Sequence, residues 1–351
     1  MSNPNAATMR TLFAEVLTLC GVGAGERVAV LSEGDILADY AAAFLRAAEG
    51  LGAETARVNV AAGESAGAAA RIANLTASGL ASDAAAMQTC KDADIVIDLM
   101  LLLFSHEQIE IQRAGTRMLM VVEPLDILAR LKPSPALRAR VEAAERRLAA
   151  ARTLRFTNEA GSDVVYELKQ LNGPPPECIL SEYGYTDTPG RWDHWPSGFL
   201  ASTGTARGVE GRVVMNAGDI VLPWKAHLGT PVGFTIKDGY VTGIDGGADA
   251  ARLRDYIERF EDPRAYAVSH IGWGLNEHAR WLADVPGIAM ESRAYYGNVL
   301  FSTGPDTEFG GSNDTPCHLD LPMRDCSLWL DDELVVDRGR IVPADMRTPG
   351  R

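Results

Sequence analysis

The 351-residue chain lacks any uninterrupted apolar run of the roughly 20 residues that a membrane-spanning helix requires. Its N-terminus also lacks an apolar stretch followed by a small-residue cleavage site, the pattern of a secretory signal peptide. Basic residues are scarce, at 33 Lys and Arg against 47 Asp and Glu. The net charge of -14 argues against a nucleic-acid partner, because phosphate binding depends on concentrated positive charge. We therefore expect a cytoplasmic protein that binds neither membranes nor nucleic acid.

Cysteine is also scarce, with five residues spread over the whole chain. An odd number at wide spacing fits neither a disulfide framework nor a CxxC metal knuckle. We therefore expect reduced thiols. Cys317 lies beside a candidate metal ligand, so it is either a small buried side chain or a redox-sensitive group.

The chain length and the different residue patterns of its two halves predict two domains, because 351 residues exceed the usual size of a single hydrophobic core. Residues 1–152 alternate apolar strand-like runs with Ala- and Leu-rich stretches, the pattern of an α/β domain with a mostly parallel sheet. Residues 135–152 carry charges around most of their surface, which predicts a long exposed helix joining the domains. The predicted strands of the first domain are 27–32, 55–60, 94–100 and 117–122, with a helix at 36–50.

Residues 153–351 predict a mixed, β-rich, metal-binding catalytic domain, and they contain five of the six histidines. Short apolar runs predict an antiparallel meander in which Asp238 and Gly239 form a hairpin turn. Residues 249–260 predict a helix, and residues 326–342 alternate in the manner of a closing hairpin. The predicted meander strands are 211–216, 219–223, 231–236 and 239–244.

The strongest chemical motif is His318-x-Asp320, within the sequence TPCHLDLPMRDC. On an extended segment, residues i and i+2 project from one face, so an imidazole and a carboxylate there can hold one ion. Two histidines and one carboxylate with open positions form the preferred iron(II) site of oxygen-activating enzymes. His270 is the candidate third ligand, because a strand-like run delivers it just before Gly272 and Gly274 bend the chain. The alternative is a hydrogen-bonded structural pair, since a lone H-x-D is common.

An aromatic-rich segment, residues 182–198, is the second concentration of functional residues. Tyrosines and tryptophans surround acidic groups in a loop ordered by Gly and Pro, a composition that suits a flat aromatic substrate. Glu182 and Trp192 are its substrate-binding candidates, and His194, which follows Asp193, is a candidate acid/base group. The alternative is a rigid loop whose tryptophans serve only packing.

A third segment, residues 292–311, is predicted to run as a strand into a sharp turn. Ser302 would present its hydroxyl near the H-x-D segment, either as a catalytic group or as a turn cap. Arg293 offers a fixed positive charge for an anionic oxygen or a ring carbonyl of a substrate.

Several segments together resemble one family, the 2,5-dihydroxypyridine 5,6-dioxygenases of bacterial nicotinate and nicotine breakdown. The resemblance is carried by YGYTDTPGRWDHWPSGFL, SHIGWGL, RAYYGNVLFSTGPDTE and TPCHLDLPMRDC, and more weakly by VVEPLDILARLKP and GTRMLMVVEP. It covers nearly the whole chain. The fold it implies is related to that of the thermophilic-type metalloaminopeptidases, with an N-terminal α/β domain and a C-terminal metal-binding domain.

The resemblance implies an iron(II) enzyme that cleaves 2,5-dihydroxypyridine, or a close analogue, with O2 to give N-formylmaleamate. It makes His270, His318 and Asp320 the iron ligands, in agreement with the motif. It also implies that Ser302 and Arg293 lie near the substrate and that His194 belongs to the acid/base groups. A homo-oligomer is expected.

One departure from the family concerns the catalytic base. The family carries a histidine in the segment after the third strand, whereas this chain reads LLFSHEQ, with Phe104 at that position and His106 two residues later. Either His106 takes over as the base, or Phe104 forms an apolar wall of a pocket retuned for another substrate.

Two other functional classes stay open at this point. A metalloaminopeptidase-like hydrolase of the same superfamily would hold two ions, with Asp219 and Glu182 available as additional carboxylates. A binding or scaffold protein that has lost activity is supported only by Phe104.

Overall fold

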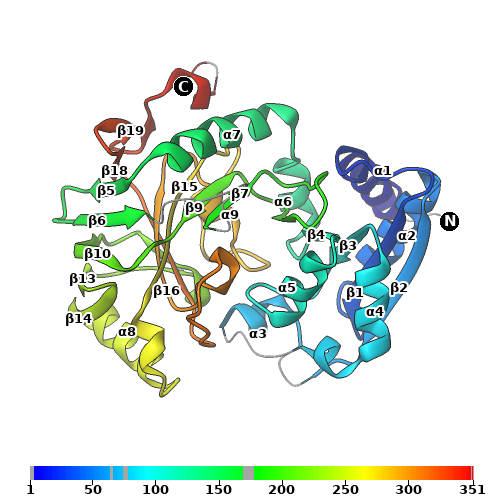
Figure 1. Cartoon of the computed structure of the whole chain (residues 1–351), viewed down its shortest axis with the longest axis horizontal. Helices are drawn as coiled ribbons and strands as arrows, with labels where there is room; N and C mark the ends of the chain where they lie inside the picture. Colours follow the sequence, from blue (N-terminus) through cyan, green and yellow to red (C-terminus); the bar gives the residue numbers. More distant parts are fainter. Residues whose placement is uncertain (1–3, 64–65, 74–77, 169–177, 349, 351) are drawn as a thin grey trace. The chain divides into compact units, whose positions relative to one another are not determined.

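The structure, a computed structural model, describes residues 4–63, 66–73, 78–168, 178–348 and 350 (Figure 1). The chain forms two compact units. Unit 1 comprises Met1–Ser134, Tyr183–Pro196 and Pro286–Ile288, and unit 2 comprises Pro135–Glu182, Ser197–Val285 and Ala289–Arg351. These units differ from the predicted domains 1–152 and 153–351, because residues 135–152 belong to unit 2 and the aromatic-rich segment belongs largely to unit 1. The predicted division into domains 1–152 and 153–351 stays a prediction.

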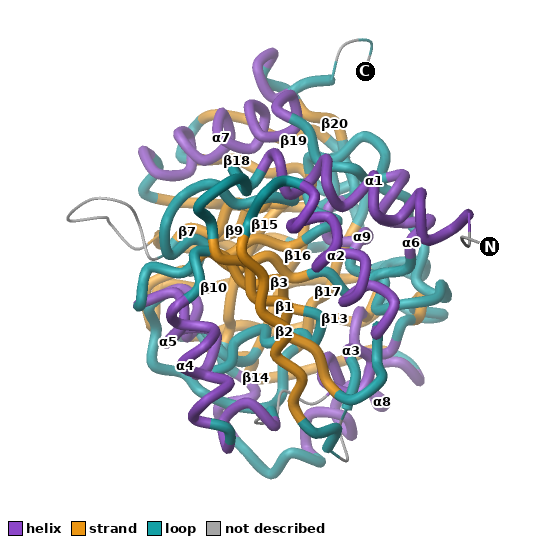
Figure 2. Tube along the Cα trace, turned by 90° about the vertical axis from the view of Figure 1, so that its right-hand side faces the viewer, coloured by secondary structure: helices purple, strands orange, loops and turns teal. Residues whose placement is uncertain are grey.

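Unit 1 contains a five-stranded parallel sheet in the order β2-β1-β3-β4-β8. Its strands β3 and β4 are buried along their whole length, as expected where helices cover both faces of a sheet. Figure 2 shows α1 and α2 on one side of β1 to β3, and α4 and α5 on the other. The strands are β1 Arg27–Glu33, β2 Glu54–Val60, β3 Ile95–Asp98, β4 Arg117–Met120 and β8 Trp192–His194; the helices are α1 Pro4–Leu19, α2 Ala38–Gly50, α3 Ala68–Ala73, α4 Ala84–Asp92, α5 His106–Arg113 and α6 Leu125–Arg130.

The four strands predicted for the first domain are all present in this sheet. The helix predicted between the first two strands is also present, as α2. The fifth strand, β8, was not predicted. It comes from the aromatic-rich segment and pairs in parallel with β4, with Met120 opposite His194.

Unit 2 contains two larger sheets, both antiparallel. The eight-stranded sheet has the order β14-β13-β10-β6-β5-β18-β19-β20, and the five-stranded sheet has the order β17-β16-β15-β9-β7. They share a core, since Phe234 and Phe301, one from each sheet, lie 5.5 Å apart between ring centroids. The strands of the first sheet are β5 Thr153–Thr157, β6 Asp163–Leu168, β10 Gly204–Met215, β13 Val232–Lys237, β14 Tyr240–Gly246, β18 Ser327–Leu330, β19 Glu333–Asp337 and β20 Arg340–Ile341; those of the second are β7 Ile179–Glu182, β9 Phe199–Ser202, β15 Val268–Gly274, β16 Val299–Thr303 and β17 Leu319–Met323.

The predicted meander is confirmed for three of its four strands. Asp238 and Gly239 both have positive φ, 50° and 76°, and close the hairpin between β13 and β14 as predicted. The prediction for 219–223 was wrong, because β11 Ile220–Val221 pairs instead with β12 Ala226–His227 in a separate two-stranded sheet. The predicted helix is α8 Ala248–Glu258, and the closing hairpin is formed by β18 and β19.

The helix over residues 135–152 is α7 Pro135–Ala150, and the prediction that it is exposed was wrong. Leu137, Val141, Ala144 and Leu148 recur at helical spacing and are buried, which outweighs the many charges in the sequence. Figure 1 shows α7, in green, lying along β7 and β9, with which it is in contact. A short helix, α9 Glu291–Ala294, precedes β16.

Candidate metal centre

Three neighbouring strands of the five-stranded sheet build the candidate metal centre. Asp320 lies in β17, His318 directly precedes that strand, and His270 lies in β15. Because β16 runs between β15 and β17, the two outer backbones are about two strand spacings, or roughly 10 Å, apart. The side chains of His270 and Asp320 therefore have to reach across β16 to meet.

A β-bulge in β15 aims His270 toward the other two ligands. Val268 pairs with Thr303 and Ile271 pairs with Phe301, so Ser269 and His270 together oppose the single residue Ser302. Ser302 is in turn directly opposite Asp320. Bulges bend the strand and redirect side chains, which makes them frequent beside active sites. The small Ser302 side chain thus lies in the row between the two ligand-bearing strands.

Gly272 and Gly274 were predicted to bend the chain after His270, and this prediction was wrong. Both lie inside β15, which continues to Gly274. A Cβ at Gly272 would lie 2.4 Å from the carbonyl oxygen of Leu200, and one at Gly274 would lie 2.2 Å from that of Tyr295. Their role is therefore to allow close approach of neighbouring backbone.

The three predicted ligands converge on one point. The Nε2 atoms of His270 and His318 lie 3.1 and 3.3 Å from the same oxygen, Oδ1 of Asp320. One potential ligand atom from each residue lies within 4.8 Å of those of the other two, and all three side chains are buried. A buried carboxylate with two imidazole nitrogens around it is the donor set expected of a cation site.

The electrostatics of these residues favour metal binding. Burial lowers the pKa of His270 to about 4, although Asp320 acts in the opposite direction. The imidazole is therefore neutral at neutral pH, which is the form that binds metals. Burial acts to raise the pKa of Asp320, but the nearby His318 and Arg293 hold it well below its usual range. Asp320 is therefore an ionised carboxylate.

A buried network of charged and polar groups contacts Asp320 through its Oδ2 atom. Arg293 Nε lies 3.3 Å from Oδ2 of Asp320, and its Nη2 donates to Oε1 of Glu182 at 3.1 Å. Ser197 Oγ donates to the other Glu182 oxygen at 2.7 Å. The guanidinium also lies 4.6 Å over the Phe199 ring. The predicted substrate residues Arg293 and Glu182 are thus brought together with the metal ligands in unit 2.

A second metal ion has little support among the described residues. Glu182 is bound to Arg293 and Ser197, and only the three residues above form a cluster with metal-ligand geometry in the described part of the chain. Asp219 instead accepts the backbone N–H groups of Asn216 and Arg324. The hydrolase alternative required these carboxylates as additional ligands.

Ser302 is buried, and its Oγ makes no hydrogen bond with any described residue. The turn-cap alternative therefore has no support. The Cys317 thiol is also buried, and burial raises its pKa to about 12. A thiol held protonated in this way is inert, which favours the structural alternative for Cys317. All five cysteines are buried and lie outside disulfides, as expected.

The remaining predicted site residues lie in unit 1. Trp192 and His194 lie two apart in β8, with their rings nearly parallel and their centroids 6.4 Å apart. The Asp193 carboxylate accepts the backbone N–H groups of Tyr183, Gly184 and His194. This carboxylate thus orders the backbone of the loop.

Phe104 lies in the loop after β3, and His106 is the first residue of α5. The two side chains have different environments. Phe104 is buried and adopts the left-handed conformation with φ of 58°. Histidine, asparagine and aspartate are enriched in that conformation, whereas bulky side chains there are rare. His106 is exposed at the first position of α5, which Ser105 caps through a bond from the Gln108 N–H.

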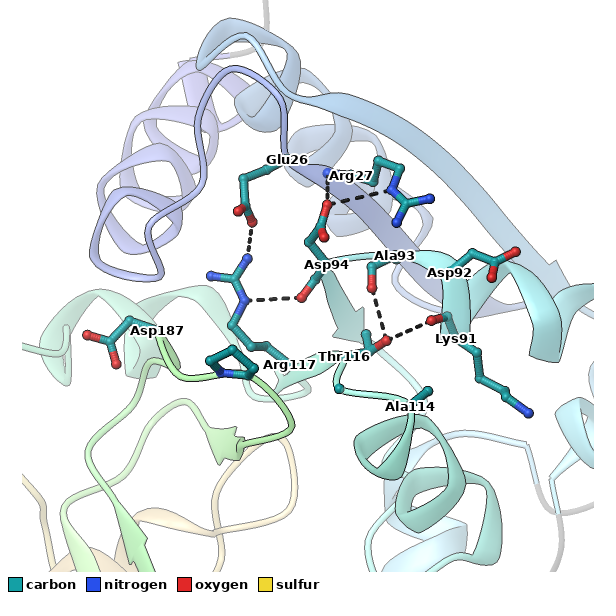
Figure 3. A pocket seen from close by; sticks show the side chains of 12 residues that line it. Glu26, Arg27, Lys91, Asp92, Ala93, Asp94, Ala114, Thr116, Arg117 and Asp187 are labelled. Atoms are coloured by element: carbon teal, nitrogen blue, oxygen red, sulfur yellow. Dashed lines mark hydrogen bonds and ion pairs between the residues drawn. The ribbon is translucent and has the colours of Figure 1, made fainter.

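A polar pocket of about 300 Å³ lies at the amino ends of β1, β3 and β4 in unit 1 (Figure 3). Arg117 is its most buried charge, and the guanidinium donates to the carbonyl oxygens of Cys20 and Asp94 and to the Glu26 carboxylate. In open parallel sheets, ligands bind at the carboxyl ends of the strands. We therefore interpret this pocket as a structural feature, in which Arg117 links the amino ends of the strands to neighbouring segments.

Ser269 also contacts His270 and was not predicted as a site residue. Its hydroxyl group lies 3.2 Å from Nδ1 of His270 and donates to the carbonyl oxygen of Pro305. The only available signal was a hydroxyl residue immediately before a candidate ligand.

The chain is similar to known proteins over most of its length. The family model of 2,5-dihydroxypyridine 5,6-dioxygenase matches residues 8–343. A curated 2,5-dihydroxypyridine 5,6-dioxygenase of Pseudomonas putida KT2440 is 47% identical over 268 residues, which is 75% of each chain. A solved structure of the dioxygenase from the same organism has a TM-score of 0.91 and 41% identity, covering 97% of this chain and 99% of that one.

A more distant structural neighbour is wild-type AmpT from Thermus thermophilus, with a TM-score of 0.59 and 14% identity over 95% of this chain and 99% of that one. At that identity the likeness concerns the fold alone, and it confirms the expected relation to the aminopeptidase-like fold. The match to the family model spans nearly the whole chain, and the curated relative is close. This chain belongs to the family of 2,5-dihydroxypyridine 5,6-dioxygenases.

Proposed function

We propose that this protein opens the ring of 2,5-dihydroxypyridine with O2 to give N-formylmaleamate, using iron(II) held by His270, His318 and Asp320. Family membership supports the reaction, and the convergence of both Nε2 atoms on Asp320 Oδ1 supports the metal site. The convergence is the observation that carries the proposal, because it brings His270 from β15 together with His318 and Asp320 at β17 into one ligand set.

The donor set suits iron(II). Two imidazoles and one carboxylate leave coordination positions open, which is the arrangement of non-haem iron(II) oxygenases. Iron(II) bound there would supply the Lewis-acid and electron-transfer chemistry by which dioxygen opens the hydroxylated ring. Both atoms of dioxygen enter the product, so the reaction needs no external reductant.

Arg293 is proposed to bind an anionic ring oxygen. Its Nε and Nη2 face Asp320 and Glu182, whereas its Nη1 lies 4.0 Å from the sulfur of Met290, a weak acceptor. Nη1 therefore keeps donor capacity for a substrate oxygen. Burial opposes the charged form, but Glu182 and Asp320 raise the pKa of Arg293, so the group stays protonated.

The proposed partners are a small aromatic N-heterocycle and O2, with assembly as a homo-oligomer. Among the described residues, we find no helix long and apolar enough to cross a membrane. The expected cytoplasmic location stays a prediction.

Anaerobic reconstitution with iron(II), followed by oxygen uptake on a panel of hydroxylated pyridines and catechols, tests the proposal. We expect one iron per chain and the fastest uptake with 2,5-dihydroxypyridine. Two zinc or cobalt ions per chain with peptidase activity, or no metal binding at all, would contradict it.

His194 is proposed as an acid/base group, since it is a buried imidazole on the same face of β8 as Trp192. His194→Ala should lower turnover by at least about 10²-fold, the usual loss when a proton-transfer group is removed. Iron content, measured by elemental analysis, should stay at the wild-type level. His194→Gln keeps a hydrogen-bonding side chain of similar size but transfers no proton, so it should be as slow. A wild-type rate for both variants would make β8 a structural strand only.

The departure at Phe104 yields another prediction. His106 is exposed, so His106→Ala should change the rate by no more than about twofold, as for ordinary surface changes. Phe104→His should accelerate cleavage of the simple dihydroxypyridine, because it adds a proton acceptor where phenyl has none and histidine tolerates the left-handed backbone. Steady-state kinetics of the three proteins on one substrate panel decide between the alternatives. A strong loss in His106→Ala would show that His106 has taken over as the base.

A further inference from the structure

Ser269 is buried in the bulge of β15, immediately before His270, and it lies outside every role assigned so far. Its hydroxyl has two neighbours. The carbonyl oxygen of Pro305 accepts its hydrogen, and Nδ1 of His270 lies 3.2 Å away. The two neighbours differ in chemistry, because a carbonyl can only accept a hydrogen bond, whereas a ring nitrogen can donate or accept.

Counting hydrogens fixes the direction of both bonds. A serine hydroxyl carries one hydrogen, and in this geometry that hydrogen is directed to Pro305. The lone pairs on Oγ are then what Ser269 offers to His270, so the Nδ1 of a neutral imidazole must carry the proton and donate it. The other ring nitrogen, Nε2, consequently has its lone pair directed at the point where His318 and Asp320 converge.

We propose that Ser269 is a positioning residue that selects the metal-binding tautomer of His270. The inference rests on the proposed function, since it concerns a ligand of the proposed metal site. Other contacts fix the ring plane but not the tautomer: the His270 ring is nearly parallel to those of Phe309 and His318, at centroid distances of 5.2 and 5.5 Å. Stacking restricts rotation, and Ser269 decides which nitrogen holds the proton.

The opposite arrangement is disfavoured by the same contacts. If Nε2 held the proton, the Ser269 hydrogen would have to turn toward Nδ1, and the buried Pro305 carbonyl would lose its donor. Hydrogen bonds behind metal-binding histidines act in this way, and their loss typically costs 10–100-fold in metal affinity.

The experiment compares Co(II) or iron(II) binding by the wild type, Ser269→Ala and Ser269→Thr under anaerobic conditions. Ser269→Ala should raise the metal dissociation constant by about 10–100-fold. Ser269→Thr keeps the hydroxyl and should restore at least part of the affinity. Ser202→Ala is the matched control, because Ser202 lies in β9 of the same sheet and also donates a buried hydroxyl to a carbonyl, that of Cys178 at 2.8 Å. Its metal affinity should be unchanged.

A second readout is the tautomer itself. Nitrogen-15 chemical shifts of His270 in the metal-free protein should show protonated Nδ1 in the wild type and an increased share of protonated Nε2 in Ser269→Ala. A wild-type ring protonated at Nε2 would overturn the inference, as would equal metal affinity of Ser269→Ala and wild type. Reduced thermal stability with unchanged affinity would assign Ser269 a purely structural role. Failure of the proposed function is distinguishable, because the wild type itself would then bind no metal.

Discussion

His318→Ala and Asp320→Ala should each release the bound iron and lower ring cleavage by more than roughly 10³-fold, because several kcal/mol of metal-supplied stabilisation is lost. Each change leaves a two-ligand site. Asp320→Ala also removes the negative charge that faces Arg293 and both imidazoles. Elemental analysis of anaerobically purified protein, together with oxygen uptake, measures both effects. The same outcome is expected for His270→Ala.

His278→Ala is the matched control for the ligand variants, because His278 is an exposed histidine of the same unit whose side chain faces Glu277. It should keep full iron content and turnover. Circular dichroism should show that the ligand variants stay folded. Full iron occupancy and near-normal turnover in His318→Ala would mean that the ligands are misassigned.

The ligand set illustrates what a single sequence can and cannot predict about a site. The geometry of His318 and Asp320 is local, since alternation along one extended segment places both side chains on one face. The geometry of His270 is tertiary. It depends on a bulge that sets Ser269 and His270 against Ser302, and no alternation pattern in β15 indicates where the extra residue falls.

The same distinction applies to the fold. The apolar strands β1 to β4 and the helix α2 follow from periodicity and turn residues, and they were predicted. The strand β8 was missed, because three residues are too few to show a period and their pairing with β4 is decided by distant parts of the chain. Helix α7 was misjudged for another reason: its charges are numerous, but a narrow buried stripe is enough to anchor it.

Arg293→Met should lower the free energy of unfolding by about 3–5 kcal/mol, because it removes the cation between two buried carboxylates. Glu182 then keeps Ser197 as its hydrogen-bond partner among the described residues, and Asp320 loses the charge on its Oδ2 side. Turnover should also fall, by about 10²-fold or more, the usual loss on removal of a donor aimed at reacting charge. Denaturant unfolding of metal-free protein measures the first effect, and oxygen uptake at full iron loading measures the second.

A control pair separates the two effects. Arg140 forms a largely buried ion pair with Glu277 in the same unit, so Arg140→Met should reduce stability while leaving turnover intact. Arg293→Lys keeps the charge but cannot present the planar fork that engages Glu182 and Asp320 together, so it should recover only part of either property.

The double variant Glu182→Gln with Arg293→Met tests whether the buried charges act as a unit. Arg293→Met alone removes the cation beside the buried Glu182 carboxylate, whereas the double variant leaves a neutral amide beside Ser197; Asp320 loses the Arg293 charge in both. The double variant should therefore lose less stability than the two single variants together, by about 0.5–3 kcal/mol, the usual coupling between contacting groups. Strict additivity would show that Glu182 and Arg293 stabilise the fold independently. Any effect of Arg293 on turnover would then be assigned to its contact with the substrate and not to its contact with Glu182.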